Sequence, residues 1–278
     1  MRDKNGETIT DEAKERARWA EHFQEILNRP LPQVPPDIPP AANQLEVNIN
    51  PPTKAEVSKA IKSLKSGKAA GPDGIPPAAL KADVQTSTEM LHPLLMKIWE
   101  NEQIPEEWKK EYLVKLPKKW DLSSCSNWRG IMLLSIPSKI LTRIILERLK
   151  KALDETLREE QAGFRQDRSC TDHIATLRII IEQSLEWQTP QYSVFDSVDR
   201  GVIWRLMQHC GSPSKFISVI QQLYDNASCQ VIHDGKLTDT FQVQTGIRQG
   251  CLLSPTIFLL VVDSIMKQAT SDIKTGIQ

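Results

Sequence analysis

The sequence predicts an α+β fold, and three features of the chain indicate it. Apolar residues recur at helical spacing over several long segments, and short segments of strand length separate them. Residues 228–243 alternate in polarity around Asp234-Gly235, which is typical of a β-hairpin. With 278 residues the chain can bury a substantial core, so we expect one elongated domain with a helical front piece.

The first predicted element is a helix that begins after Thr10 and ends near Asn28. Its apolar face consists of Trp19, Phe23, Ile26 and Leu27, and this face requires a partner surface. Residues 30–52 contain eight prolines, so we expect an extended linker there rather than a packed element.

The next helix is marked by Thr53 and Glu56, which have the spacing of a capping box, and it should close near Gly67. Residues 86–110 are expected to form further helix. Short strands are then predicted over residues 111–116 and 131–134.

A long helix is predicted from about Ser138 to Leu157, because Ile140, Ile144, Ile145 and Leu149 fall on one of its faces. After it we expect a helix over 171–187, a short strand over 192–195, and two helices over 198–210 and 212–225, all ahead of the hairpin. The last predicted element is a helix with Ser254 as N-cap and Pro255 in its first turn. Residues 257–262 of this helix are apolar on every side, so it should be buried.

The overall charge does not indicate a nucleic-acid-binding protein, since 35 basic residues balance 35 acidic ones. Any basic surface must therefore be local. One candidate is the run of Lys109, Lys110, Lys115, Lys118 and Lys119, and another is a lysine stripe at positions 59, 62, 65 and 68. The stripe has an alternative interpretation as the solvated face of an ordinary amphipathic helix.

Several other classes of protein are disfavoured by the composition. The five cysteines are widely spaced and include no C-x-x-C pair, which argues against a structural zinc site or a disulfide framework. No signal peptide is evident, and the longest apolar run is too short to span a bilayer. We therefore expect a soluble, intracellular protein without a membrane partner.

The most informative stretch is residues 246–258, which read G-I-R-Q-G-C-L-L-S-P-T-I-F. Gly246 and Gly250 allow the backbone to approach a ligand closely, while Arg248 and Gln249 present a cation and an amide ahead of the helix dipole. Such a turn is suited to meeting a base pair and its phosphate. The alternative is an ordinary loop that enters a core helix.

Residues 248–258 of this run resemble the template and nucleotide positioning motif of reverse transcriptases from non-LTR (LINE-type) retrotransposons. Three further segments resemble motifs of that family in the same order: residues 68–76 the N-terminal extension, 112–151 the fingers motif, and 161–174 the motif that follows it. The resemblance implies a right-hand polymerase fold with fingers and an incomplete palm. It also implies RNA-directed DNA polymerase activity, with an RNA template, a DNA primer and Mg²⁺ as the cofactor of the family.

The resemblance also implies a division of the chain. Residues 1–52 would be a helix and a Pro-rich linker, and residues 53–110 a helical N-terminal extension. Residues 111–190 would form the fingers and residues 191–278 part of the palm. The oligomeric state does not follow from the resemblance.

Family positions that contact nucleotide and template can be carried over residue by residue. Residues expected at the nucleotide are Lys118, Lys119, Arg129, Phe195, Gln249 and Gly250. Residues expected at the template are Gly163, Phe164, Arg165, Arg168 and Arg248. Lysine and arginine suit phosphate contact, although Lys118, Lys119 and Arg129 have an alternative interpretation as an exposed basic cluster between a strand and a loop. Trp120 stands where the family usually has glycine, which puts the shape of that loop in doubt.

The chain departs from the family where polymerase catalysis requires carboxylates for two divalent metal ions. The first palm motif reads Y-S-V-F-D-S-V-D-R at residues 192–200 and lacks the segment that carries the catalytic aspartate. The chain also stops at Gln278, ahead of the family's Asp-Asp strand. Asp196 is a weak substitute candidate, so we expect no intact catalytic residue and no specifically bound Mg²⁺.

The sequence thus favours a fragment of a non-LTR retrotransposon reverse transcriptase that does not polymerise. Two alternatives remain open. One is a noncatalytic module that binds RNA or an RNA·DNA hybrid, and the other is an expressed relic without a function.

Overall fold

The computed structural model describes residues 1–30, 36–118, 121–157 and 198–271. Its α-helices are α1 (Glu12–Leu27), α2 (Lys54–Lys62), α3 (Pro77–Ala82), α4 (Val84–Asn101), α5 (Ile136–Thr156), α7 (Arg200–His209), α8 (Ser214–Tyr224) and α9 (Ser254–Ser271). Short 3-10 helices are η1 (Glu106–Lys109) and η2 (Cys125–Asn127). The strands are β1 (Lys110–Pro117), β2 (Trp128–Leu133), β3 (Ser228–His233), β4 (Lys236–Leu237) and β5 (Phe241–Gln242). The α+β class is confirmed.

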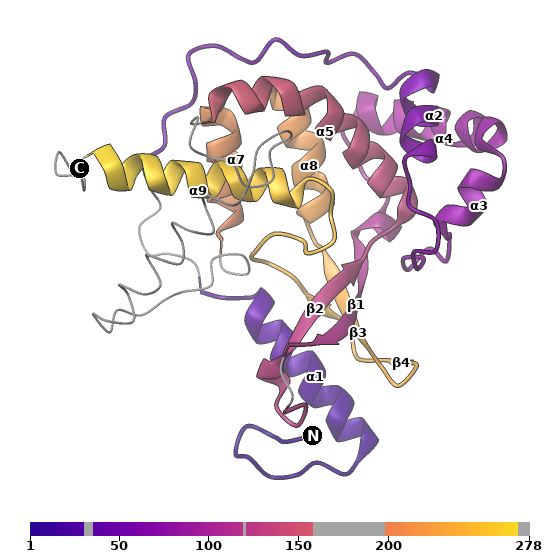
Figure 1. Ribbon diagram of the computed structural model, residues 1–278, viewed down its shortest axis with the longest axis vertical. Helices are drawn as coiled ribbons and strands as arrows, with labels where there is room; N and C mark the ends of the chain where they lie inside the picture. Colours follow the sequence, from indigo (N-terminus) through magenta and orange to yellow (C-terminus); the bar gives the residue numbers. More distant parts are fainter. Residues whose placement is uncertain (31–35, 119–120, 158–197, 272–278) are drawn as a thin grey trace.

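The strands form one sheet in the order β2-β1-β3-β4. Strand β5 pairs antiparallel with the first two residues of β3. Most of the helices gather into a body at one end of this sheet, while α1 crosses its other end (Figure 1). The β3–β4 hairpin is confirmed, and its turn residues Asp234 and Gly235 both have positive φ, at 48° and 74°. The sheet is mixed: β1 pairs antiparallel with β2 but parallel with β3. A long connection through the helical body makes the parallel pairing possible.

The local signals at helix starts were read correctly. Asp11 caps α1 by accepting a hydrogen bond from the backbone N of Lys14, 2.8 Å away. Thr53 and Glu56 form both hydrogen bonds of the capping box of α2. In α5 the four expected isoleucine and leucine side chains are all buried. Caps and periodicity act over a few residues, so they survive tertiary packing.

Helix ends were predicted less well. The helix expected over 86–110 stops at Asn101, because Glu102 takes the left-handed conformation with φ 55° and Pro105 follows. The helix expected to close near Gly67 ends at Lys62. The helix predicted over 171–187 and the strand predicted over 192–195 lie outside the described residues.

The core is continuous between the helical body and the sheet. Trp99 of α4 meets Phe216 of α8 edge to face, with ring centroids 5.3 Å apart. α9 is largely buried, as its apolar sequence predicted, and it packs against α7. None of the helices in the described part of the chain is long and apolar enough to cross a bilayer.

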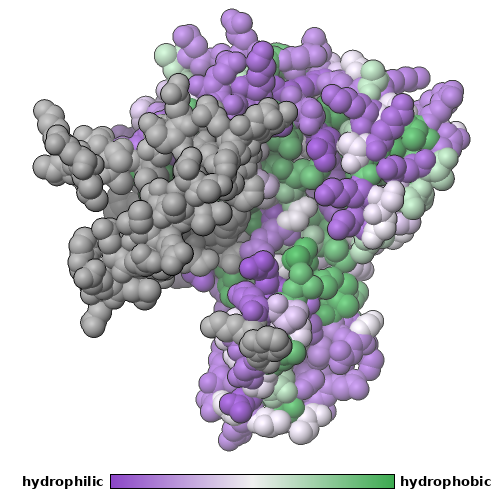
Figure 2. All heavy atoms as spheres, in the orientation of Figure 1, coloured by the Kyte–Doolittle hydropathy of each residue, from purple (hydrophilic) through white to green (hydrophobic). Residues whose placement is uncertain are grey.

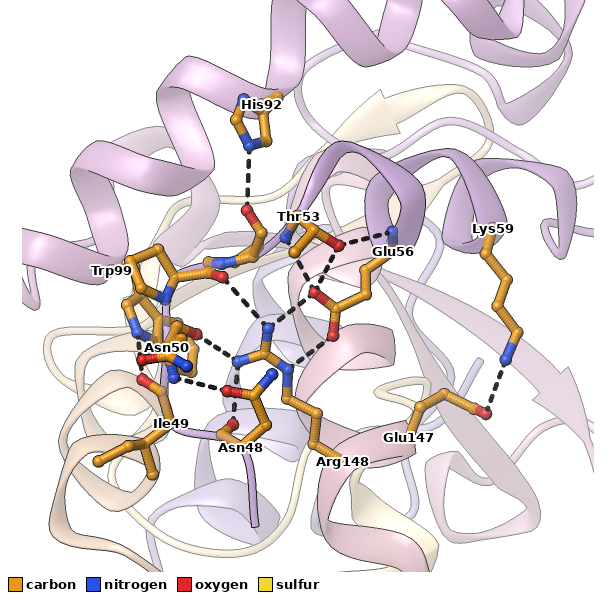
Figure 3. A network of polar contacts seen from close by, with 12 residues as sticks. Asn48, Ile49, Asn50, Thr53, Glu56, Lys59, His92, Trp99, Glu147 and Arg148 are labelled. Atoms are coloured by element: carbon orange, nitrogen blue, oxygen red, sulfur yellow. Dashed lines mark hydrogen bonds and ion pairs between the residues drawn. The ribbon is translucent and has the colours of Figure 1, made fainter.

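The described residues of the Pro-rich segment contain no helix or strand before α2, but hydrogen bonds anchor the segment to the helical body. Arg148 of α5 is responsible at one end: its guanidinium donates to the carbonyl oxygens of Asn48, Asn50 and Pro51 (Figure 3). Trp99 Nε1 donates to the carbonyl of Ile49 at 3.0 Å. Buried donors thus satisfy a backbone that cannot pair with itself.

The same guanidinium forms a two-pronged ion pair with Glu56, in which Nε and Nη2 each lie 2.7 Å from a carboxylate oxygen. The Arg148 side chain is 5% exposed and that of Glu56 is 29% exposed. Hydrogen bonds from Arg148 hold the pKa of Glu56 well below its ordinary value of 4.5, at about 2. The pair therefore ties the N-terminus of α2, the Pro-rich segment and α5 together.

We expect acid to destabilise this junction. A carboxylate with a lowered folded-state pKa contributes stability above its unfolded pKa, and that contribution is lost as the pH falls from about 4.5 towards about 2. In urea unfolding, the free-energy difference between wild type and Glu56→Gln should shrink over this range. The matched control is Glu147→Gln, which removes a carboxylate that lies 3.8 Å from exposed Lys59. If both variants gave the same pH dependence, the Arg148 pair would not be its source.

Candidate nucleotide-binding site

A cleft of about 490 Å³ is lined by residues from the C-terminal half of α1, from strands β1 and β2, and from the turn before α9. In the space-filling view hydrophobic residues gather in the waist between the helical body and the lobe that carries α1 (Figure 2). The lining residues come from α1, from the β1–β2 hairpin and from the turn: Phe23, Ile26, Leu27, Leu113, Lys118, Trp128, Arg129, Gly130, Met132 and Gln249. Three residues predicted at the nucleotide, Lys118, Arg129 and Gln249, are therefore brought together.

Lys118 and Arg129 lie at the loop end of the β1–β2 hairpin, next to the segment that connects the two strands. The antiparallel register pairs Leu116 with Arg129, and the backbone N of Lys118 donates to the carbonyl of Asn127 at 2.7 Å. Both basic residues are exposed, and neither forms an ion pair within the described part of the chain. Two cations without a carboxylate partner are chemically suited to a phosphate group.

The turn at residues 246–250 is seated directly on β2. The backbone N of Met132 donates to the carbonyl of Gln249 at 2.8 Å. Gly250 has φ 127°, and a Cβ at this position would lie 2.4 Å from the carbonyl oxygen of Met132. The sequence predicted a close approach for Gly250, and the structure shows that this approach is to the protein's own backbone. This contact fixes Gln249 at the edge of the cleft.

Arg248 lies elsewhere than the sequence predicted. Its side chain is 2% exposed and forms an ion pair with Glu111 of β1, which is fully buried. The guanidinium carbon of Arg248 lies 5.1 Å from the ring centroid of Tyr224, and that of Arg200 lies equally far from it. The expected template contact is therefore corrected: the Arg248 side chain is buried in the core, where it pairs with the carboxylate of Glu111.

In the cluster of Glu111, Arg200, Tyr224 and Arg248, burial shifts the pKa values of ionisable side chains. Burial raises the pKa of Glu111, while the two guanidinium groups oppose that shift. Burial lowers the pKa of Arg200 to about 10, and its Nη1 donates to the carbonyls of Tyr224 and Val243, both at 2.8 Å. The cluster connects β1, α7 and α8 to the turn at residues 246–250, which carries Gln249 of the cleft.

The basic run at residues 109–119 does not form one patch. Lys109 is buried and pairs with Glu106 at 2.7 Å. Lys115 is packed over the ring of Trp19, 4.4 Å from its centroid, beside His233. Of the described lysines in this run, Lys118 is the one that lines the cleft.

The other predicted site residues lie outside the described residues. These are Lys119 and Phe195 at the nucleotide, Gly163, Phe164, Arg165 and Arg168 at the template, and the substitute candidate Asp196. No group of three or more His, Cys, Asp or Glu side chains suited to a metal ion occurs in residues 1–30, 36–118, 121–157 and 198–271.

Sequence reasoning missed the contribution of α1. The amphipathic pattern showed that Phe23, Ile26 and Leu27 need a partner surface, but it did not show which surface they meet. Trp128 was also missed as a lining residue, although it lies next to Arg129. Its position in the chain, directly before a residue that was predicted to contact the nucleotide, could have identified Trp128.

The chain is similar to a family of polymerases and to proteins of transposable elements. The family described as "Reverse transcriptase (RNA-dependent DNA polymerase)" matches residues 116–277, more than half of the chain. The chain is 27% identical over 223 residues to the "Transposon TX1 uncharacterized 149 kDa protein" of Xenopus laevis, covering 78% of this chain and 17% of that protein. In Drosophila melanogaster it is 25% identical over 210 residues to the "Retrovirus-related Pol polyprotein from type-2 retrotransposable element R2DM", covering 73% and 19%. It is also 26% identical over 273 residues to the "Putative 115 kDa protein in type-1 retrotransposable element R1DM", covering 95% and 25%. The chain thus spans a quarter or less of these three relatives.

Proposed function

Since the chain belongs to the reverse transcriptase family and is related to non-LTR retrotransposon proteins, we propose that it is a fragment of such a reverse transcriptase that binds nucleotide and nucleic acid without polymerising. The observation that carries this proposal is the cleft, where Lys118, Arg129 and Gln249 meet within the matched region. The family uses Mg²⁺ and binds a template and a primer.

The geometry supports binding in two ways. Lys118 and Arg129 present two cations at one rim of the cleft, where they can hold the phosphates of a nucleotide or of a nucleic-acid strand. Gln249 also lines the cleft, and its backbone is held in place by the hydrogen bond from the backbone N of Met132 to its carbonyl. Charge contacts of this kind are independent of base sequence.

The absence of polymerisation is proposed from the first palm motif. Residues 192–200 read Y-S-V-F-D-S-V-D-R, without the segment that carries the catalytic aspartate in the family. Two-metal catalysis needs several carboxylates to hold the two divalent metal ions, and Asp196 by itself does not supply them. Binding and catalysis are therefore separate in this proposal, because function resides in the site and not in the fold.

The basic cleft also favours a second candidate, a noncatalytic module that binds RNA or an RNA·DNA hybrid as its own function. Both candidates predict binding by the purified chain. An expressed relic without a function, in contrast, predicts neither stable folding nor salt-dependent binding.

We expect the purified 278-residue chain to bind a labelled RNA·DNA hybrid but to incorporate no nucleotide when Mg²⁺ and deoxynucleoside triphosphates are added. Lys118→Ala and Arg129→Ala should each weaken binding about tenfold, because each loses a charge-assisted phosphate contact. Each should also reduce the slope of log affinity against log salt by about 1. Fluorescence anisotropy over a salt series measures both quantities.

The matched control is Lys97→Ala, which removes an exposed lysine of α4 outside the cleft. It should bind like the wild type. Equal affinity of all three variants would refute the cleft as the binding site, and a processive cDNA product would refute the noncatalytic proposal.

A further inference from the structure

The cleft has two chemically different walls. The β1–β2 hairpin contributes the basic residues Lys118 and Arg129, which we call the basic wall, whereas the residues that α1 contributes are all apolar and make up the apolar wall. Phe23 and Leu27 of this wall are buried, and Ile26 is partly exposed. Helix α1 precedes residue 116, where the family match begins, so this wall is not part of the matched region.

The C-terminal end of α1 is fastened to the segment that leads into the turn. Asn28 makes two hydrogen bonds with its carboxamide: Nδ2 donates to the carbonyl of Gln242, and Oδ1 accepts from the backbone N of Gln244, both at 2.8 Å. The backbone N of Thr245 donates to the carbonyl of Leu27 at 3.0 Å. The contact with Thr245 satisfies the carbonyl of Leu27, which has no partner within the helix because it lies in the last turn.

The other half of α1 is fastened to the sheet. Glu15 lies 3.2 Å from Nε2 of His233 at the end of β3. The ring of Trp19 packs beneath the ammonium group of Lys115 and meets the ring of Trp128 edge to face, with centroids 5.6 Å apart. Helix α1 is therefore held at both ends, and its apolar wall keeps a fixed distance from the basic wall.

A cleft lined by cations from one element and by apolar side chains from another matches the two parts of a nucleotide. Cations hold the phosphates, while an aliphatic or aromatic surface accepts the face of any base without reading its hydrogen bonds. We propose that α1 is the base-contacting wall of the cleft, with Ile26 packing on the nucleobase, and that Asn28 is a positioning residue that fixes α1 relative to Gln249. This inference rests on the proposed function, because it assumes that a nucleotide enters the cleft.

The test uses the full chain and two probes, dATP and inorganic tripolyphosphate, each competing with a fluorescent deoxynucleoside triphosphate. Ile26→Ser should weaken dATP binding about fivefold and leave tripolyphosphate binding unchanged, because only dATP has a base. Ile26→Leu should restore dATP binding. Asn28→Ala should weaken dATP binding to a similar extent, whereas Lys118→Ala should weaken the binding of both probes.

Leu94→Ser is the matched control, since it makes an apolar residue of α4 polar at a site that is 37% exposed and away from the cleft. Tryptophan fluorescence checks that each variant remains folded. Wild-type dATP affinity in both Ile26→Ser and Asn28→Ala, with loss in Lys118→Ala, would overturn the role of α1 and leave the proposed function intact. Failure of the wild type to bind either probe would overturn the proposed function, and this inference with it.

Discussion

Replacing Gly250 with alanine is expected to lower the free energy of unfolding by about 3 kcal/mol or more and to abolish nucleotide binding at the cleft. Gly250 has φ 127°, a conformation that side chains with a Cβ rarely adopt. The added Cβ would also lie 2.4 Å from the carbonyl oxygen of Met132. That oxygen belongs to β2 and cannot move aside as a flexible side chain would, so the turn must lift away and take Gln249 with it.

Urea unfolding followed by tryptophan fluorescence measures the loss of stability, and competition with a fluorescent nucleotide measures binding. Gly235→Ala is the matched control, because Gly235 also has a positive φ, at 74°, but a Cβ there would meet nothing within 4 Å. The control should cost about 1 kcal/mol and leave binding unchanged. Equal effects of the two substitutions would show that the contact with Met132 does not hold the turn.

Replacing Glu111 with alanine is expected to cost about 3 to 5 kcal/mol, because it leaves two buried guanidinium groups without a carboxylate. The side chains of Arg248 and Glu111 are 2% and 0% exposed, so water cannot take the place of the lost carboxylate. Nε and Nη2 of Arg200 and Nη2 of Arg248 already have no hydrogen-bond acceptor among the described residues. Removing the carboxylate of Glu111 therefore raises the cost of burying both arginines.

A double variant separates charge from packing. Combining Glu111→Leu with Arg248→Met should recover more than half of the stability that Glu111→Ala loses, because an apolar pair replaces the ion pair. Glu12→Ala is the control: it removes the carboxylate of the exposed pair with Lys236, and it should affect the free energy of unfolding far less. If Glu111→Ala cost no more than this control, the buried pair would not stabilise the turn.

The candidate site was predicted in part. Lys118, Arg129 and Gln249 were expected at one site and share one cleft in the structure, although their contact with a nucleotide stays a prediction. Arg248 was placed on the template because a basic residue in a glycine-bounded turn was expected to face a ligand. Its burial against Glu111 could not be foreseen, since the local sequence does not show that β1 carries a carboxylate at that point in space.

The sequence by itself determined the features that depend on a few neighbouring residues. The helix start after Thr10, the cap at Thr53, the hairpin turn at Asp234-Gly235 and the buried face of α5 were all readable, because each arises from contacts within one or two turns of chain. The tertiary structure decided which surfaces meet. The parallel pairing of β1 with β3 and the docking of α1 through Asn28 join segments far apart in the chain, and apolar faces alone do not specify their partners.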